Sequence, residues 1–573
     1  MWRAYILIFF LSTSFQLFAQ ILKVDTLKAS FKTRGALDSL DCHSNFFSLP
    51  YVPFGLNSFP SETVIMPGNQ LIYDQSPTPQ RIIFSALPHI GFGYSFGQQG
   101  TQLLTANYQQ LISSAVLINA DIVQNKSTGF QRNSLFNDFN YRLLMRISIG
   151  KVENISSFEK STIVSNWSGG LTNDSLLFIL PQTLVSVNKV DAFSKTSTTV
   201  LMNNFRYNLL KKETTSMGLQ VVGAYSTIKR FYNEEGDLAL IYPMVNIDSS
   251  ETSDSISLTR MKAKAGFFYE NKNFKFLSHI SLENWQSKTL GRSIDTNELS
   301  LDHYLEYKGK KWSFISKGVY GIYGNFSSLD LQNHVSGRYN LFTLNFNNQF
   351  SLSPPTPFLR DYRGNTLDYF LSAITLQQTM KFGAEAIFRK SFFFAQLGGD
   401  YIQSKNAYYF NSVNWTNVDN PLIDVYKLTG RTGINFKHLV GVVSYQFTSI
   451  NEELRYIPQH QASIRFALKT GLFKDGRLKS ILGFDAYILS AHKRLVYSPS
   501  MGAFDIAALN TQESLPGFYS LGCFANFNVN QFRFFVRMDN ISYYWVNKRI
   551  PIIEGYYYPL PQFKLGISWD FWN

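Results

Sequence analysis

The sequence predicts an all-β protein, a transmembrane antiparallel β-barrel with an even number of strands, about 20 within a range of roughly 16 to 22. Three observations predict this fold class. After about residue 80, apolar and polar residues alternate in runs of about 9 to 13 residues, long enough to cross a bilayer at a tilt. Charged residues form only 16% of the 573 residues, and aromatic residues form another 16%. Beyond residue 20, no apolar run approaches the roughly 18 residues of a spanning helix.

The N-terminal part of the chain has a different pattern. Residues 1–19 have the layout of a secretory signal peptide, with Arg3 ahead of an apolar run and Ala19 before the expected cleavage site. Residues 20–80 contain six prolines and show little alternation. We interpret this segment either as a periplasmic leader or as a partial plug inserted into the barrel. Residues 81–573 are assigned to the barrel itself.

The alternation recurs from ribbon to ribbon along the barrel region. In the last ribbon, residues 563–571, odd-numbered positions are apolar and even-numbered positions are polar or small, so one face of the strand is apolar and the other polar. Residues 261–283 repeat the pattern on both sides of a short turn, which predicts a hairpin. The same pattern marks further ribbons at 141–149, 342–352, 462–469 and 532–539.

Short and long connections mostly alternate between these ribbons. Outer-membrane barrels have this asymmetry, with tight turns on the periplasmic side and long loops on the extracellular side. We expect short turns near 110–111, 211–214, 271–273, 309–310, 340, 390, 436 and 530. We expect long polar loops near 124–133, 169–195, 231–256, 286–297, 353–370, 405–421, 491–515 and 545–562.

A membrane barrel explains the runs better than a soluble β-sandwich does. A sandwich would also alternate, but its strands are usually only about 5 to 6 residues long. Aromatic residues cluster at the ends of several runs, at 408–410, 543–545 and 556–558. Because aromatic rings with a polar edge favour the lipid headgroup level, we expect these clusters to lie there.

Two stretches resemble a known family. Residues 517–545, GFYSLGCFANFNVNQFRFFVRMDNISYYW, and residues 556–571, YYYPLPQFKLGISWDF, resemble the end of the putative porin family of Bacteroidota outer membranes. Residues 354–365, PPTPFLRDYRGN, resemble a mid-barrel loop of that family. The resemblance implies an outer-membrane barrel. Its closing strand also resembles the signal read by the outer-membrane barrel assembly machinery, which implies that role for Gly566, Trp569 and Phe571.

Charged residues share the polar phase of the ribbons, where they would face the lumen. Basic residues are slightly more numerous, and a channel lined in this way would concentrate anions. The alternative interpretation is that mixed charges simply solvate and cross-brace a wet interior. Nucleic-acid binding is a poor explanation of the net charge of +13, because these residues form no exposed patch. The candidate lumen-facing charges are Arg142, Arg146, Lys262, Lys264, Lys381, Glu385, Arg389, Arg465, Arg533, Arg537 and Asp539.

No catalytic, cofactor-binding or metal-binding residues are predicted, and we do not expect an enzyme. Residues 93–97, GYSFG, fit the G-x-S-x-G pattern of hydrolases, but that mechanism needs a helix directly after the serine. The residues that follow have no helical periodicity, so a glycine-rich segment between strands is the simpler interpretation. The eight histidines are scattered and form no metal-binding motif.

Together these features predict a porin-like channel for small polar solutes, with a weak anion preference, in the outer membrane of a Gram-negative bacterium. The expected partners are outer-membrane lipid, the barrel assembly machinery and the solutes; no nucleic acid is expected, and no oligomer interface is apparent. The alternative is a barrel occluded by residues 20–80 and its long loops. Such a barrel would act as an energised transporter or as a structural or partner-docking protein.

Overall fold

The computed structural model describes the barrel region of the chain. It describes residues 87–572 except 243, 325–327, 356–359, 372–373, 411–414, 418–422, 451–456, 474–476, 494–495, 506–513, 546–550, 554 and 558–559. The predicted signal peptide at 1–19 and the predicted leader or plug at 20–80 lie outside the described residues. Within the described residues, no helix has the length and apolar character needed to cross a membrane.

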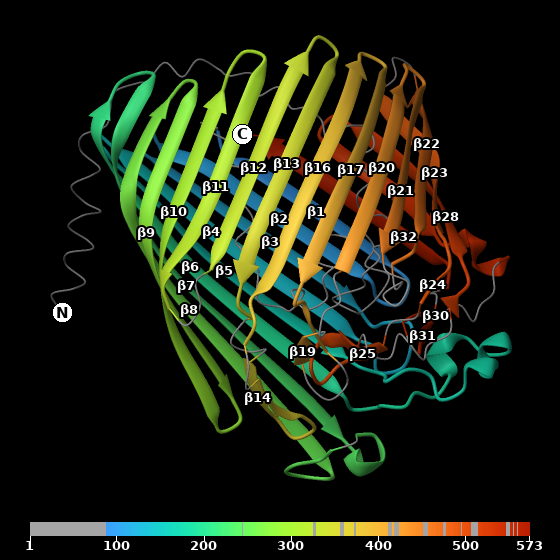
Figure 1. The fold of residues 1–573 in the computed structure, drawn as a ribbon. Helices are drawn as coiled ribbons and strands as arrows, with labels where there is room; N and C mark the ends of the chain where they lie inside the picture. The colour runs from blue at the N-terminus through green and yellow to red at the C-terminus, as the bar shows by residue number, and fades with distance from the viewer. Residues whose placement is uncertain are drawn as a thin grey trace, which may run out of the picture.

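Twenty-two long strands form one antiparallel barrel (Figure 1). They are β1 (His89–Gly97), β2 (Gln102–Ser113), β3 (Val116–Ser127), β4 (Phe136–Ile149), β5 (Val152–Asn166), β6 (Phe193–Lys211), β7 (Thr215–Glu235), β8 (Glu251–Asn271), β9 (Phe274–Thr289), β10 (Arg292–Lys308), β11 (Trp312–Tyr323), β12 (Leu329–Tyr339), β13 (Phe342–Ser353), β16 (Gln377–Lys390), β17 (Phe393–Lys405), β20 (Ile423–Asn435), β21 (Leu439–Ile450), β22 (His460–Leu472), β23 (Leu478–Leu489), β28 (Phe518–Val529), β29 (Phe532–Asp539) and β32 (Gln562–Trp572).

Smaller elements lie in the connections between barrel strands. They are the 3₁₀ helices η3 (Asp174–Phe178), η4 (Gln182–Leu184), η5 (Leu238–Leu240) and η9 (Ile541–Tyr544), and the short strands β14 (Asp361–Arg363), β15 (Asp368–Phe370), β18 (Tyr408–Phe410), β19 (Trp415–Asn417), β24 (His492–Lys493), β25 (Val496–Ser498), β26 (Ala503–Asp505), β27 (Ser514–Leu515), β30 (Pro551–Ile553) and β31 (Tyr556–Tyr557).

The barrel closes between its first and last strands. Each long strand pairs with its neighbour in sequence order, and β1 pairs both with β2 and with β32. Gly93, for example, lies opposite Thr105 on β2 and opposite Ser568 on β32. Because no strand edge is left open, the backbone N–H and C=O groups of the wall bond to each other and need no water. The predicted fold class is confirmed, and the 22 strands lie within the expected range.

The two ends of the barrel differ in their connections. At one end, every connection has five residues or fewer, as at 150–151, 212–214 and 530–531. At the other end the connections include 167–192 and 490–517. The short turns lie at the top of Figure 1 and the long connections at the bottom. By the rule for outer-membrane barrels, the short-turn end faces the periplasm and the long-loop end faces the outside.

Two predicted connections were wrong. Residues 110–111 lie inside β2, and the turn comes at 114–115. The long loop predicted at 286–297 is a two-residue turn at 290–291 between two continuing strands. This stretch appeared to be a loop because both of its faces are polar: Ser287 and Thr296 are buried on the inner face, while Gln286 and Asp295 lie on the outer face and bond to each other across the hairpin at 3.2 Å. The Asn284 amide donates to Asp295 at 2.5 Å and to Asn297 at 2.9 Å.

The predicted aromatic clusters also lie elsewhere than expected. Tyr408 and Tyr543 belong to long connections and are buried there, away from the strand ends of the wall. Tyr544 and Trp545 are exposed but lie in or beside η9. The sequence pattern failed here because a ring beside a strand end can pack under a loop as easily as it can meet lipid. The exposed rings near the short turns come from other residues, among them Trp312.

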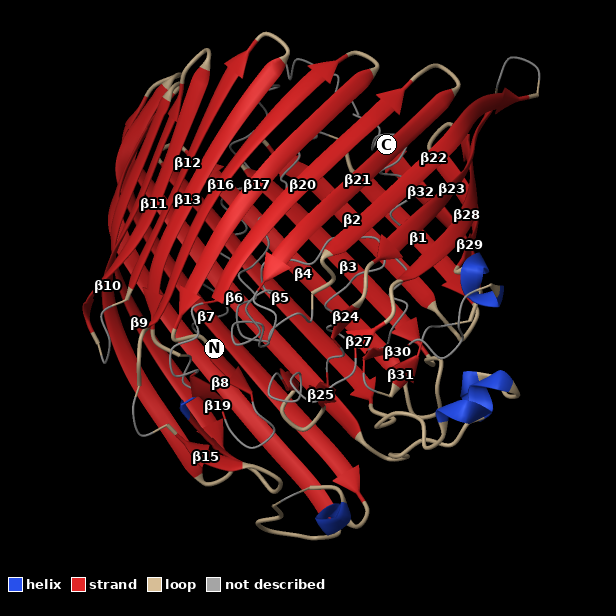
Figure 2. Ribbon diagram, turned by 45° about the vertical axis from the view of Figure 1, so that its right-hand side comes forward, coloured by secondary structure: helices blue, strands red, loops and turns tan. Residues whose placement is uncertain are grey.

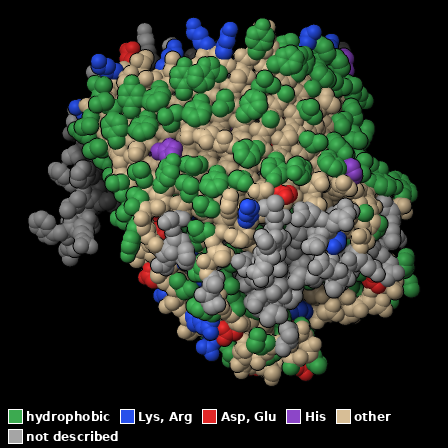
Figure 3. Space-filling view, viewed as in Figure 1, with side chains coloured by type: hydrophobic (Ala, Val, Ile, Leu, Met, Phe, Trp, Pro, Cys, Tyr) green, Lys and Arg blue, Asp and Glu red, His purple; other side chains and the backbone are tan. Residues whose placement is uncertain are grey.

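The outer face of the wall is apolar. On β13, Phe342, Leu344 and Phe346 are about half exposed, whereas Thr343 and Asn345 between them are less exposed and face inward. Figure 3 shows the hydrophobic side chains covering the wall above the long loops. An apolar outer band with a polar inner phase is the arrangement of a membrane barrel.

The wall is taller on one side. Strands β7 and β8 have 21 residues each, whereas β1 has nine and β29 has eight. The long strands run well past the rest of the wall at the long-loop end (Figures 1 and 2). They therefore offer an inner surface to the connections that cross the opening.

A charge on the outer face should destabilise the barrel in lipid. Phe346→Arg places a guanidinium against hydrocarbon, and we expect it to lower the free energy of unfolding by about 2–4 kcal/mol. The matched control, Asn347→Arg, directs the same group inward and should cost much less. Denaturant titration in lipid vesicles measures both values. Equal costs would contradict the assignment of the two faces.

Candidate functional site

The inner wall carries ion pairs between neighbouring strands. Many of the predicted lumen-facing charges have a carboxylate partner on an adjacent strand. The pairs on adjacent strands are Arg142–Asp121 at 3.3 Å, Arg146–Glu153 at 2.7 Å and Lys262–Glu283 at 2.8 Å. Lys264 on β8 pairs with Asp302 on β10, across one intervening strand. Arg206 on β6, which was not among the predicted residues, likewise pairs with Glu270 on β8 at 3.1 Å. Paired in this way, the charges contribute less to the field in the lumen than their number suggests.

A second group of predicted charges lies on β16. Glu385 accepts hydrogen bonds from the Asn345 and Gln396 amides of the two flanking strands. Arg389 is exposed near the short-turn end, and Lys381 is only partly exposed. All three share the phase opposite the exposed Phe382.

The remaining predicted charges lie on β22 and β29, among the last strands of the barrel. Arg537 contacts Asp485 at 2.8 Å and also Asp539, while Lys564 contacts Asp539 at 3.0 Å. Arg465 lies 3.9 Å from Asp485. Only 5% of the Arg537 side chain and 2% of the Asp539 side chain are exposed. This chain of charges crosses β22, β23, β29 and β32, so it ties the last strands together.

Two further predicted residues lie on these strands: Arg533, a candidate lumen-facing charge on β29, and Gly566, part of the candidate assembly signal on β32. Arg533 lies with its guanidinium 5.4 Å from the centre of the Phe535 ring. The same ring packs on Gly566 of β32, where a Cβ atom would come within 2.2 Å of it. Gly566 is therefore fixed by packing as well as by any role in assembly.

The aromatic residues of the closing strand form a small stack. The Trp569 and Phe571 rings are 4.1 Å apart, and Phe532 meets Trp569 edge to face at 5.8 Å. Trp569 is exposed on the outer face.

Long connections lie across the opening at the long-loop end. We call the described parts of connections 167–192, 354–376, 406–422, 490–517 and 540–561 the lid. Its clearest contact is made by Arg230 on β7, which donates to the Ser500 carbonyl at 2.5 Å and to the Pro499 carbonyl. Residues 499–500 lie between β23 and β28, far from β7 in the ring of strands. The connection must therefore extend across the lumen to reach Arg230.

An apolar cluster holds the lid on the inner wall. Inner-phase residues of β7 and β8 pack against residues of three lid connections. The cluster consists of Ile228, Ile256, Leu258, Tyr362, Leu367, Tyr369, Tyr408 and Met501. Removing such side chains from water stabilises the closed arrangement. The sequence contains a signal for this cluster, because the residues that face inward become apolar at Ile228, Ile256 and Leu258. The signal was missed because most of residues 228–258 were assigned to a loop at 231–256.

Other lid connections contact each other through close backbone packing. Gly170 and Gly555 have φ values of 88° and 75°, and a Cβ atom on either would lie under 3 Å from the Cα of the other. The Tyr557 hydroxyl bonds to Asp174 at 3.2 Å. The Trp167 ring lies 4.8 Å from that of Tyr497. Three connections are thereby joined over the opening.

A buried polar cluster fastens connection 167–192 to β7. Lys189 lies 2.6 Å from Glu234, which also accepts from the hydroxyls of Tyr232 and Tyr242. Burial lowers the pKa of Lys189, although Glu234 opposes that change. Burial, followed by the charge of Glu234, raises the pKa of Tyr242. Breaking a buried pair of this kind by removing one partner is costly, so the cluster favours the closed lid.

The GYSFG motif has no hydrolase geometry. Ser95 lies within β1, opposite Leu103 and Gly566, and β1 continues to Gly97 before a short turn into β2. The strand–turn–helix that presents a nucleophilic serine is not formed there. Among the described residues, no cluster of three metal-ligating side chains occurs.

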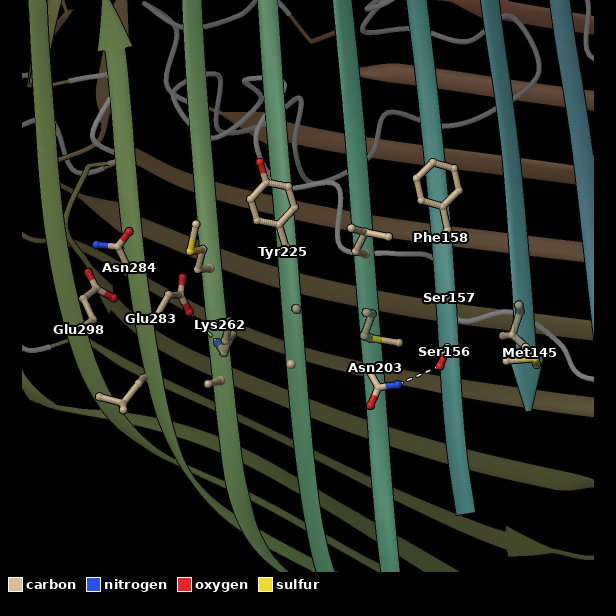
Figure 4. Close-up of a pocket in the computed structure, with 18 of the residues that line it drawn as sticks. Met145, Ser156, Ser157, Phe158, Asn203, Tyr225, Lys262, Glu283, Asn284 and Glu298 are labelled. Atoms are coloured by element: carbon tan, nitrogen blue, oxygen red, sulfur yellow. Dashed lines mark hydrogen bonds and ion pairs between the residues drawn. The ribbon is translucent and has the colours of Figure 1, made fainter. Parts of the chain in front are cut away.

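A groove of about 1200 Å³ lies on the outer face of β3 to β11 (Figure 4). Exposed apolar residues of successive strands line it, including Leu143, Leu201, Met261 and Leu282. Within it, the Asn203 amide donates to Ser156 at 2.8 Å. Because these residues share the lipid-facing phase, the groove belongs to the membrane surface and not to a solute path.

The lid should loosen in acid through His492. Burial lowers the pKa of this lid residue to about 4, whereas an unfolded histidine titrates near 6.5. The stabilising effect is thus complete above about pH 6.5 and is lost as the pH falls towards 4, by up to about 3 kcal/mol. Hydrogen exchange of residues 490–493 and 496–503, corrected for intrinsic rates, should rise between pH 7.5 and 4.5. His492→Gln should flatten this dependence, and unchanged protection in the wild type would contradict it.

Comparison with solved structures shows shared architecture. The FrpB iron transporter from Neisseria meningitidis (F3-3 variant) matches with a TM-score of 0.60, 10% identity, and coverage of 85% of this chain and 82% of that one. The siderophore receptor PirA from Acinetobacter baumannii matches with a TM-score of 0.59, 10% identity, and coverage of 86% and 81%. A mutant of the ferric enterobactin receptor PfeA from Pseudomonas aeruginosa matches with a TM-score of 0.61, 10% identity, and coverage of 86% of this chain and 81% of that one. At this identity, the likeness concerns the barrel fold alone.

Comparison of sequences gives the family. No curated protein matches the chain significantly. The model of the family described as "Putative porin" matches residues 19–573, which includes the whole barrel. The chain is therefore an outer-membrane β-barrel protein that belongs to the putative porin family.

Proposed function

We propose that this protein passes small polar solutes across the outer membrane through a lumen that its lid gates. The observation that carries the proposal is the closed ring of strands with an apolar outer face and an inner wall of ion pairs such as Arg146–Glu153. Such a wall can hydrate a solute path while the outer face stays in lipid. Membership of the putative porin family supports the same function.

The lid gives this channel a closed state. The lid is fastened to the tall side of the wall by the apolar cluster, by Arg230 and by the Lys189–Glu234 pair. These contacts are discrete and lie at the end of the barrel, so the lid can detach without disturbing the ladder of strands. Opening would uncover the inner wall to the outside.

The alternative is an energised transporter whose lumen is filled by another segment. The iron transporter and the siderophore receptor named above share the barrel fold, and residues 20–80 are the candidate plug. In that case the lid would enclose a bound solute instead of limiting diffusion.

The proposed partners follow from the apolar outer band and from the closing strand β32. Outer-membrane lipid would surround the apolar band, and the barrel assembly machinery would read Gly566, Trp569 and Phe571 on β32. The proposal includes no nucleic acid and no enzymatic reaction. The resemblance of residues 517–545 and 556–571 also leads us to propose a bacterium of the Bacteroidota as the source, with residues 1–19 as its signal peptide.

Releasing the lid should increase conductance. Arg230→Ala removes the donor that holds the Pro499 and Ser500 carbonyls, so purified protein in planar bilayers should spend a larger fraction of time in stepwise open states. Lys229→Ala, an exposed neighbour on the outer phase of the same strand, should behave like the wild type.

A different set of results would favour the alternative. If the wild type and Arg230→Ala both stay silent, while deletion of residues 20–80 produces conductance, the plugged transporter is supported and free diffusion is contradicted. If no variant conducts, both transport proposals fail.

We expect a weak anion preference. Reversal potentials across a potassium chloride gradient should give a chloride-to-potassium permeability ratio above one, because basic residues are slightly more numerous in the inner phase. Lys381→Gln with Arg389→Gln should lower this ratio. Glu385→Gln on the same strand should raise it. A ratio below one, or one that all three substitutions leave unchanged, would contradict the proposal.

A further inference from the structure

Exposed basic residues gather at the short-turn end. Within the short turns and the two residues on either side of each, 13 Lys and Arg residues are exposed. Glu213 is the only exposed carboxylate among the described residues of the same set. Figure 3 shows Lys and Arg side chains along this edge of the wall. The exposed basic residues are Lys151, Lys211, Lys212, Lys272, Lys308, Lys310, Lys311, Arg338, Arg389, Lys390, Lys437, Arg477 and Lys479.

These charges have few internal partners. Within the described residues, Lys308 is the only one of them that forms an ion pair, with Glu306 at 2.5 Å. Lys211 donates to the Gly150 carbonyl at 3.0 Å. The inner wall differs, because there most basic residues lie against a carboxylate of a neighbouring strand. Arg389 lies in the lumen-facing phase of β16, and the other charges of the rim remain available to something outside the chain.

Large exposed rings lie beside the basic residues. Lys311 precedes Trp312, Lys437 follows Phe436, and the Lys390 ammonium lies 5.6 Å from the centre of the Phe392 ring. The Phe392 and Phe436 rings stack at 5.4 Å. Because aromatic rings of a membrane protein lie at the lipid headgroup level, the neighbouring lysines lie at the level of the lipid phosphates.

We propose that this basic and aromatic rim binds the anionic headgroups of phospholipids in the leaflet that faces the periplasm. Juxtamembrane Lys and Arg residues are attracted to an anionic membrane surface, each by roughly fivefold in binding. The charge is spread from Lys151 to Lys479, over turns that follow one another around the wall. A ring of separate charges fits many small anionic lipids better than it fits one acidic protein, which would need a contiguous patch on one side.

The test compares lipid binding by two charge-matched variants of the full chain. The protein in neutral detergent micelles is titrated with phosphatidylglycerol or with phosphatidylcholine of the same acyl chains, and bound lipids are counted by native mass spectrometry. The rim variant is Lys311→Gln, Lys390→Gln and Lys437→Gln. The control variant is Arg132→Gln, Lys195→Gln and Lys229→Gln, which removes three exposed charges near the long-loop end. Heat-modifiable gel mobility verifies that both variants are folded.

The wild type should bind phosphatidylglycerol more tightly than phosphatidylcholine. The rim variant should lose at least about tenfold of the phosphatidylglycerol affinity, with phosphatidylcholine unchanged, and the control variant should stay within about twofold of the wild type. Equal binding of the two lipids by the wild type would overturn the proposal. Equal losses of phosphatidylglycerol affinity in the two variants would also overturn it, because they would show that binding depends only on the net charge of the protein. Unchanged lipid binding in a folded rim variant would leave an acidic protein as the partner of the rim and would also overturn it.

Discussion

The structure depends on one constraint: every backbone N–H and C=O group of a strand in lipid must have a partner in the protein. The chain meets it by pairing β1 with β32, so that the sheet has no edge. Once the ring is closed, the alternation of side chains decides the rest. The side chains of one face must be compatible with hydrocarbon, and the polar side chains of the other face must find partners on the inner wall. This requirement explains why Arg142 and Arg146 lie against carboxylates on neighbouring strands.

The unequal height of the wall is the second determinant. Strands β7 and β8 continue beyond the bilayer, where their inner phase no longer faces a solute path. There it becomes apolar at Ile228 and Ile256 and serves as a base for connections that begin on the far side of the barrel. The lid thus packs on the part of β7 and β8 that continues the alternating pattern beyond the bilayer. Its contacts with the wall lie outside the region that lipid surrounds.

The sequence predicted the barrel and the faces of its strands because alternation is a local property that survives without knowledge of neighbours. It did not predict what depends on contacts between distant segments. The partners of Arg230 are the carbonyls of Pro499 and Ser500, and Tyr408 is buried by residues from β7 and β8. The β9–β10 hairpin was missed because Asn284 and Asp295 are polar outside the bilayer, where a strand and a loop have similar composition.

Closure between β1 and β32 is tested most directly by a disulfide across the seam. A Cβ atom at Gly93 would lie 3.9 Å from that of Ser568, a separation that suits a disulfide. The chain has two cysteines, Cys42 and Cys523, which are first replaced by serine. In that background, G93C with S568C should cross-link on mild oxidation in lipid and change gel mobility. G93C with I567C, where the second side chain lies on the opposite face, should not. If both pairs cross-link alike, or neither does, the closed register described here is contradicted.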